Sequence, residues 1–147
     1  MKSRLAIQID APLERIYPLA SDVERWPERL PHYRYVRRVD SANGERRFAM
    51  GARRGRIPVR WEATQRLIPA ERRIEFVHTG GVTRGMQVAW HFEPAGDGWE
   101  VSIEHQLDLA WPLIGRIAAE RVIGPQFVEA IARRTLRRVK VLAEAGA

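Results

Sequence analysis

The sequence lacks cysteine altogether, and it contains very little lysine and asparagine. Without cysteine, the 147 residues can form neither a disulfide framework nor a thiolate metal site, and they offer no cysteine nucleophile. No apolar run is long enough to span a bilayer. The opening residues, MKSRLAIQIDAP, alternate apolar and polar types, whereas a secretory signal has a continuous apolar block. These absences predict a cytoplasmic protein.

The positive charge of the chain comes almost entirely from arginine. The formal net charge is +7, and Lys2 and Lys140 are the only lysines among 25 basic residues. Between Arg25 and Arg73, 14 arginines stand against five acidic residues, a local net charge of +9. One interpretation is a thermophile-like composition, in keeping with the single asparagine. The other is a partner with an anionic surface, a membrane or RNA, because arginine binds phosphates and carboxylates in bidentate fashion.

Length and composition predict a single domain over residues 1–147. Hydrophobic residues make up 45% of the chain and charged residues 29%, as in an ordinary globular domain with enough residues to bury a core. The sequence has no internal repeat, low-complexity tract or linker that would mark a domain boundary.

Most of the chain alternates apolar and polar residues with the period of β-strands. The alternating stretches are 4–10, 56–67, 72–79, 85–93 and 99–109, with further strand expected from Tyr33 onward. Asn43 and Gly44 suit a hairpin turn that requires positive φ angles. The alternation predicts an antiparallel sheet with one dry face.

Two short helical pieces are expected after the first strand. They cover residues 12–20 and 21–29, and a proline in each keeps it short. Ser21, with Glu24 three residues later, indicates a capping box at the start of the second piece. The pair would seal one end of the sheet with Trp26 as a packing plug.

The last third of the chain changes to the helical period. Residues 126–145 predict one long amphipathic helix whose apolar stripe covers the dry face of the sheet. Residues 112–123 also favour a helix, which ends at Gly124 and Pro125. This break is either a plain helix end or the hinge of a gate over residues 112–125.

The order of elements and two local motifs resemble a known superfamily. Residues 9–12 read I-x-A-P and residues 22–27 read D-x-E-x-W-P. Together with the order of one strand, two short helices, six strands and a long C-terminal helix, they resemble the START-like or SRPBCC superfamily, in its polyketide cyclase/dehydrase and coenzyme Q-binding-protein branch. The resemblance implies an α+β helix-grip fold. In it, a curved antiparallel sheet of about seven strands wraps the C-terminal helix around an apolar cavity.

The parity of the strands predicts which side chains line that cavity. His78 and His105 fall on the dry face, where an unpaired polar group costs about 1–3 kcal/mol. They are either core histidines bonded to each other, to Thr79 or to Arg84, or ligand contacts, or general acid/base residues. Tyr33 is expected near the mouth, and His32 and His91 carry little weight. The predicted ligand-binding residues are Trp61, Phe76, His78, Arg84, Met86, Val88, Trp90, Ile103, His105, Phe127 and Ile131.

The resemblance implies binding of a hydrophobic small molecule, such as a lipid, quinone or polyketide-like compound, by a carrier or chaperone. The first alternative is a polyketide aromatase/cyclase-dehydratase, in which His78, His105 or Arg84 would move protons, although no family catalytic set matches residue by residue. The second alternative is a ribosome- or RNA-associated toxin-like protein that uses its basic surface. A monomer or a weak dimer through surfaces such as Trp111 fits either case.

Several other kinds of chemistry are absent from the sequence. The four histidines are scattered without metal-ligand spacing, so no metal is expected. There is no G-x-S-x-G elbow, no G-x-G-x-x-G and no P-loop, so neither a serine hydrolase nor a nucleotide cofactor is expected.

Overall fold

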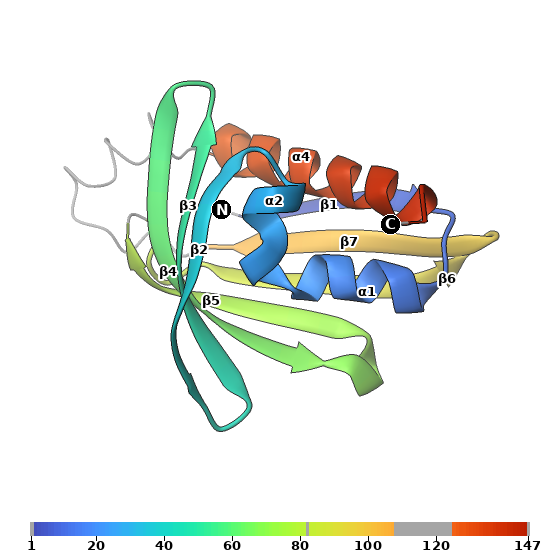
Figure 1. The fold of residues 1–147 in the computed structure, drawn as a ribbon, viewed down its shortest axis with the longest axis horizontal. Coiled ribbons are helices and arrows are strands. Elements are labelled where there is room, and N and C mark those ends of the chain that lie inside the picture. The colour runs from blue at the N-terminus through green and yellow to red at the C-terminus, as the bar shows by residue number, and fades with distance from the viewer. Residues whose placement is uncertain (1, 82, 108–124, 147) are drawn as a thin grey trace.

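A curved antiparallel sheet forms the body of the protein (Figure 1). The structure, a computed structural model, describes residues 2–81, 83–107 and 125–146, and for residues 54 and 125–127 it describes the backbone alone. Its strands are β1 (Lys2–Ile9), β2 (Tyr33–Ala42), β3 (Glu45–Arg54), β4 (Ile57–Ile68), β5 (Arg73–Gly81), β6 (Gln87–Ala95) and β7 (Gly98–Gln106). The strand order is β1-β7-β6-β5-β4-β3-β2, so every neighbouring pair except β1 and β7 is a hairpin. In the described residues, no helix is long and apolar enough to cross a bilayer.

Three helices within the described residues cover one face of this sheet. They are α1 (Leu13–Ser21), α2 (Trp26–Arg29) and α4 (Pro125–Glu144), with a short 3-10 turn at Val23–Arg25. The long helix α4 lies along the sheet with α1 beside it (Figure 1). The Arg15 Nε donates to the Ala143 carbonyl at 2.7 Å, which joins α1 to the end of α4. The predicted α+β helix-grip fold is therefore confirmed.

The predicted capping box is wrong. Ser21 is the last residue of α1 and does not begin a new helix. The helix runs this far because Leu19, Ala20 and Ser21 are all buried against the core, and the Ser21 carbonyl accepts from Gln65 Nε2 at 2.8 Å. No side-chain cap is found at the 3-10 turn in the described part of the chain, and Glu24 pairs instead with Arg38.

Glycine and asparagine shape the hairpins in two ways. Asn43 (φ 53°) and Gly44 (φ 77°) form the left-handed turn between β2 and β3, as predicted. Gly55 (φ 59°) serves the next turn, whereas Gly51 lies inside β3. A Cβ on Gly51 would lie 2.3 Å from Cε1 of Tyr35, so glycine is needed there to let the ring of Tyr35 lie against the strand.

The interior has a solidly packed end, which we call the filled end. It lies where α1 and the last turns of α4 meet β1, β6 and β7. The fully buried apolar residues there are Ile9, Ile16, Phe92, Val101 and Val139. Tyr17 packs on Phe92 with ring centroids 5.2 Å apart. The predicted helix over 112–123, the Gly124 hinge and Trp111 lie outside the described residues.

Candidate functional site

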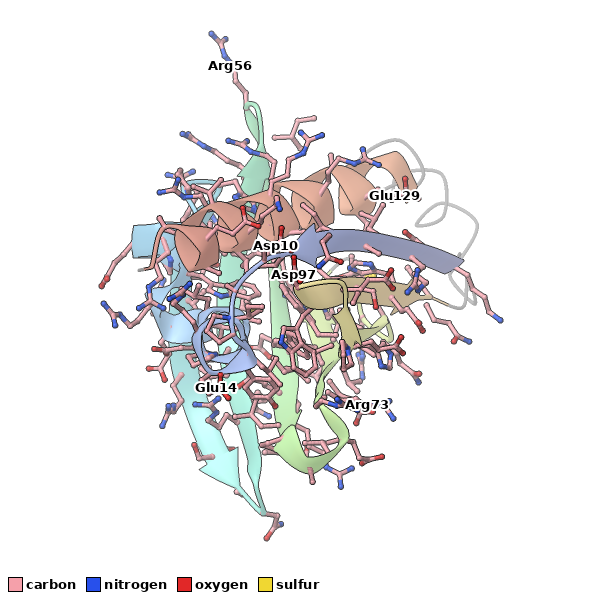
Figure 2. All side chains as sticks on the ribbon, turned by 90° about the vertical axis from the view of Figure 1, so that its right-hand side faces the viewer. Asp10, Glu14, Arg56, Arg73, Asp97 and Glu129 are labelled. Carbon is pink, nitrogen blue, oxygen red and sulfur yellow. The ribbon has the colours of Figure 1, made fainter. Side chains whose placement is uncertain are left out.

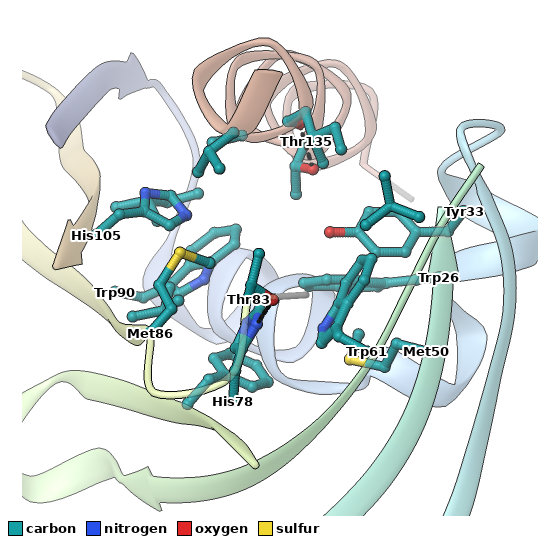
Figure 3. A pocket seen from close by; sticks show the side chains of 17 residues that line it. Trp26, Tyr33, Met50, Trp61, His78, Thr83, Met86, Trp90, His105 and Thr135 are labelled. Atoms are coloured by element: carbon teal, nitrogen blue, oxygen red, sulfur yellow. Dashed lines mark hydrogen bonds between the residues drawn. The ribbon is translucent and has the colours of Figure 1, made fainter. Parts of the chain in front are cut away.

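The other end of the interior is hollow, and we call it the hollow end. Between the sheet and the first half of α4 lies a cavity with about 650 Å³ free of protein atoms, counting its opening, and about 80 Å³ in which the centre of a water molecule fits. Figure 3 shows its walls, which are mainly aromatic and aliphatic. The lining residues are Trp26, Tyr33, Met50, Val59, Trp61, Phe76, His78, Thr83, Met86, Val88, Trp90, Ile103, His105, Val128, Ile131, Ala132 and Thr135.

Most of the predicted ligand-binding residues meet at this cavity. Those that line it are Trp61, Phe76, His78, Met86, Val88, Trp90, Ile103, His105 and Ile131. Arg84 does not, because its side chain is exposed in the turn between β5 and β6, where the alternation of the strands ends. The side chain of Phe127 lies outside the described residues. Contact of any of these residues with a ligand stays a prediction.

His78 is a hydrogen-bonded histidine in the cavity wall. Its Nδ1 lies 2.6 Å from Thr83 Oγ1, and its ring stacks on Trp61 with centroids 5.6 Å apart and planes 3° from parallel. The partner is neither Thr79, which is exposed on the other face, nor Arg84. The turn after β5 folds Thr83 back into the interior instead. Burial, and then the neighbouring His105, lowers the pKa of His78 to about 3.

His105 differs from His78 in one decisive respect. Its Nδ1 is buried and has no hydrogen-bond partner among the described residues, although the side chain lines the cavity. Ser3, its partner in register on β1, has a buried hydroxyl that also lacks a partner within the described part of the chain. Burial lowers the pKa of His105 to about 4, so the ring is neutral at pH 7. A buried polar atom without a partner is costly unless a ligand or water completes it.

A second polar group lies across the cavity, where the turn before β2 meets α4. His32 Nε2 lies 2.9 Å from Thr135 Oγ1, and Thr135 donates its single proton to the Ile131 carbonyl at 2.8 Å. His32 must therefore be the donor in its bond to Thr135. The phenol of Tyr33 is buried beside them, and burial raises the pKa of its hydroxyl. Figure 3 shows this hydroxyl directed into the cavity.

The sequence pattern places His32 in a loop and so gives it little weight as a site residue, and the structure has it in the turn before β2. It is buried, and burial followed by the charge of Arg134 lowers its pKa to about 4. One signal was present in the sequence: Thr135 is polar yet falls on the apolar stripe of the C-terminal helix, which indicates a buried polar partner. Further lining residues that were not predicted as site residues are Met50, Val59, Thr83, Val128 and Ala132.

Trp26 lines the cavity and is almost fully buried. Its ring packs on Tyr33 at 4.8 Å and on Trp90 at 6.1 Å between centroids. The indole Nε1 donates to the Leu19 carbonyl at 2.9 Å, so this polar atom is satisfied within the protein. Across the described ranges, no three histidine, aspartate or glutamate side chains gather closely enough to hold a metal ion. The site can therefore enclose an apolar molecule and offer hydrogen bonds to its polar groups.

A helix-grip domain with an apolar, histidine-bearing cavity is the class that the fold and the site define. Residues 9–132 match the family model described as "Polyketide cyclase / dehydrase and lipid transport". This match covers most of the chain, and the protein belongs to this family.

Two curated relatives are bifunctional cyclase/dehydratases of polyketide synthases. The granaticin protein of Streptomyces violaceoruber is 28% identical over 112 residues, which cover 74% of this chain and 35% of the relative. The actinorhodin protein of Streptomyces coelicolor is 31% identical over 101 residues, which cover 67% of this chain and 32% of the relative. The chain thus spans about a third of the length of these relatives.

Two solved structures share the architecture almost from end to end. A crystal structure of a Thermus thermophilus protein is 25% identical with a TM-score of 0.73 and covers 95% of this chain and 97% of its own. The Zhui aromatase/cyclase from Streptomyces sp. R1128 is 17% identical with a TM-score of 0.79 and covers 98% and 93%. At that identity, the likeness to the aromatase/cyclase shows the common fold.

Proposed function

We propose that this chain binds a polyketide-like molecule in its cavity and promotes ring closure and dehydration, with His105 as the proton-accepting residue. The single observation that carries the proposal is the buried Nδ1 of His105, which lacks a partner among the described residues and lies in a mainly apolar wall. The family match and the cyclase/dehydratase relatives support this class of reaction. The His105 side chain lines the cavity, so a ligand bound beside the ring would bring an oxygen or an acidic C–H group to the imidazole.

The chemistry requires one proton to leave carbon and one to reach oxygen. A methylene between two carbonyls gives its proton to the imidazole, the resulting enolate forms a carbon–carbon bond with a second carbonyl, and that oxygen takes a proton. Loss of water from the product then gives the double bond. A neutral His105 is in the correct state to accept the first proton. Its lowered pKa makes it a weak base, but a negative enolate beside the ring would raise that pKa again.

The remaining lining has the shape-selecting role in this proposal. The walls formed by Trp61, Trp90 and Phe76 would hold a flat ligand, since aromatic rings provide large apolar contact areas. The Tyr33 hydroxyl, on the side opposite His105 in Figure 3, would bind a carbonyl oxygen.

A carrier without catalysis is the second candidate, and the hydrogen bonding of His78 favours it. This histidine is already satisfied by Thr83, as in a purely structural wall. A carrier needs the apolar cavity and no base. The two functions differ in whether the bound molecule is changed.

The experiment compares His105→Ala with His91→Ala, which alters a histidine on the opposite face of the sheet. The substrate is a linear poly-β-ketone thioester, and cyclised product is followed by absorbance and mass spectrometry. We expect wild type and H91A to accelerate cyclisation over buffer, and H105A to lose about 100-fold in rate while still binding the reaction product. If wild type binds the product but gives no acceleration, the carrier function replaces the cyclase.

A further inference from the structure

The hairpin between β3 and β4 projects from the molecule at the hollow end. Apart from the two neighbours of Gly55 in the chain, no described residue lies within 4 Å of the position where a Cβ on Gly55 would stand, so the described residues leave this side of the tip open. Figure 2 shows Arg56 extending from this tip into solvent. Ile57, the next residue, is an exposed apolar side chain with 45% of its surface accessible. Cationic and apolar side chains thus share one protruding turn.

The tip is continuous with the basic surface of α4. The backbone N–H of Arg53 donates to the His32 carbonyl at 3.0 Å, and the charge of Arg134 on α4 acts on the same His32. We call the exposed arginines of the tip and of this helix face the basic rim. Its members are Arg53, Arg56, Arg133, Arg134 and Arg137.

The basic rim is not neutralised by neighbouring carboxylates. Among the residues that the structure describes, no rim arginine has a carboxylate oxygen within ion-pair distance. By contrast, Arg4 and Arg73, on the outer face at the other side of the sheet, pair with Glu100 and Glu75. Unpaired arginines on a protruding edge form a region of positive potential.

The rim lies directly beside the cavity. Along the hairpin, Met50 pairs with Trp61 and Ala52 with Val59, and three of these four residues line the cavity. Arg53 follows Ala52 at the next pair, and a strand advances only about 3.3 Å per residue. A surface that meets the tip would therefore lie next to the cavity that holds the apolar molecule.

We propose that the basic rim docks the protein on an anionic lipid surface, with Ile57 entering the headgroup region. The arginines match the negative headgroups, and an exposed isoleucine at the tip fits a lipid interface better than a polar partner. In contrast to a single-strand binder, the tip carries no aromatic residue on which bases would stack. The proposal goes beyond the cyclase function and does not depend on it, because docking requires no turnover.

The test is co-sedimentation with vesicles of phosphatidylcholine, with and without phosphatidylglycerol, at low and high salt. Wild type should bind the anionic vesicles at low salt and the neutral ones weakly. Each arginine near an anionic surface contributes about fivefold to binding, so Arg53→Gln with Arg56→Gln should weaken it about 25-fold. Ile57→Ser should weaken binding several-fold without changing its dependence on salt.

The matched control is Arg4→Gln with Arg25→Gln, which removes the same charge from two arginines that already pair with Glu100 and Glu28. This control should bind within about twofold of wild type, because paired surface ions contribute little. Three results would overturn the proposal: no binding of wild type to anionic vesicles at low salt, an equal loss in both double variants, or tighter binding to single-stranded RNA than to vesicles.

Discussion

The filled end and the hollow end of the interior share one sheet and one helix, yet they are built from different residues. At the filled end, Ile9, Phe92 and Val139 are fully buried, and Tyr17 packs on Phe92. At the hollow end, the same faces carry His78 and His105 around the cavity. The two halves of α4 therefore have different roles. The C-terminal half packs tightly and stabilises the protein, whereas the N-terminal half is left incompletely packed and can receive a molecule.

The largest effect should come from emptying the filled end. Phe92→Ala removes a ring that is 1% exposed and should lower the free energy of unfolding by about 3–5 kcal/mol. Phe76→Ala at the hollow end should cost only about 2 kcal/mol, because part of that ring already faces the cavity. Urea unfolding followed by tryptophan fluorescence measures both. Equal losses would contradict the division into two ends.

A second effect is the dependence of stability on pH, which the hollow end should dominate. The pKa values of His32, His78 and His105 fall from 6.5 in the unfolded chain to about 4, 3 and 4. The unfolded chain therefore binds more protons below pH 6.5, so these groups destabilise the fold as the pH falls from about 6.5 toward 4.

Each such histidine adds up to about 1.4 kcal/mol per pH unit to the slope of stability against pH. His105→Leu should remove one such contribution, which unfolding curves at several values between pH 6.5 and pH 4 can measure against wild type. An unchanged slope would mean that His105 takes up its proton over the same pH range in the folded and the unfolded chain, so that its pKa is not lowered.

The smallest effect should be that of His105→Leu at pH 7. The substitution removes a buried nitrogen that has no partner in the described residues and puts an apolar side chain of similar size in its place. The free energy of unfolding should stay the same or rise by about 1 kcal/mol. A loss above about 2 kcal/mol, measured by the same urea titration, would show that His105 is a structural residue.

The sequence predicted the strands and most of the cavity wall, because alternation along a strand fixes which side chains face inward. Trp61, Trp90 and Ile103 follow directly from that parity. The prediction failed where parity ends. Arg84 is predicted to line the cavity, but it lies in the turn after β5. In the same turn, Thr83 bonds to His78, although the sequence does not predict Thr83 as a site residue.

The other errors arose at helix boundaries and across long distances in the chain. Nothing local to Ser21 shows that burial extends α1 through it, so its motif with Glu24 was misread as a helix start. His32 meets Thr135 across 103 residues of sequence, a contact that a single sequence without a fold cannot reveal. These are cases in which tertiary packing overrides a local preference.

The pairing of β1 with β7 also has a consequence for how the chain folds. Lys2 aligns with Gln106, so β1 pairs with a strand that lies about 100 residues later in the sequence. The hairpins from β2 to β7, in contrast, join strands that are adjacent in the sequence. Strand β1 is also held by α4, where Lys140 Nζ donates to the Gln8 carbonyl at 2.7 Å. We therefore expect the docking of β1 and α4 to be the slow step of refolding. A chain arrested before this step would contain the hairpins but would lack the ligand cavity.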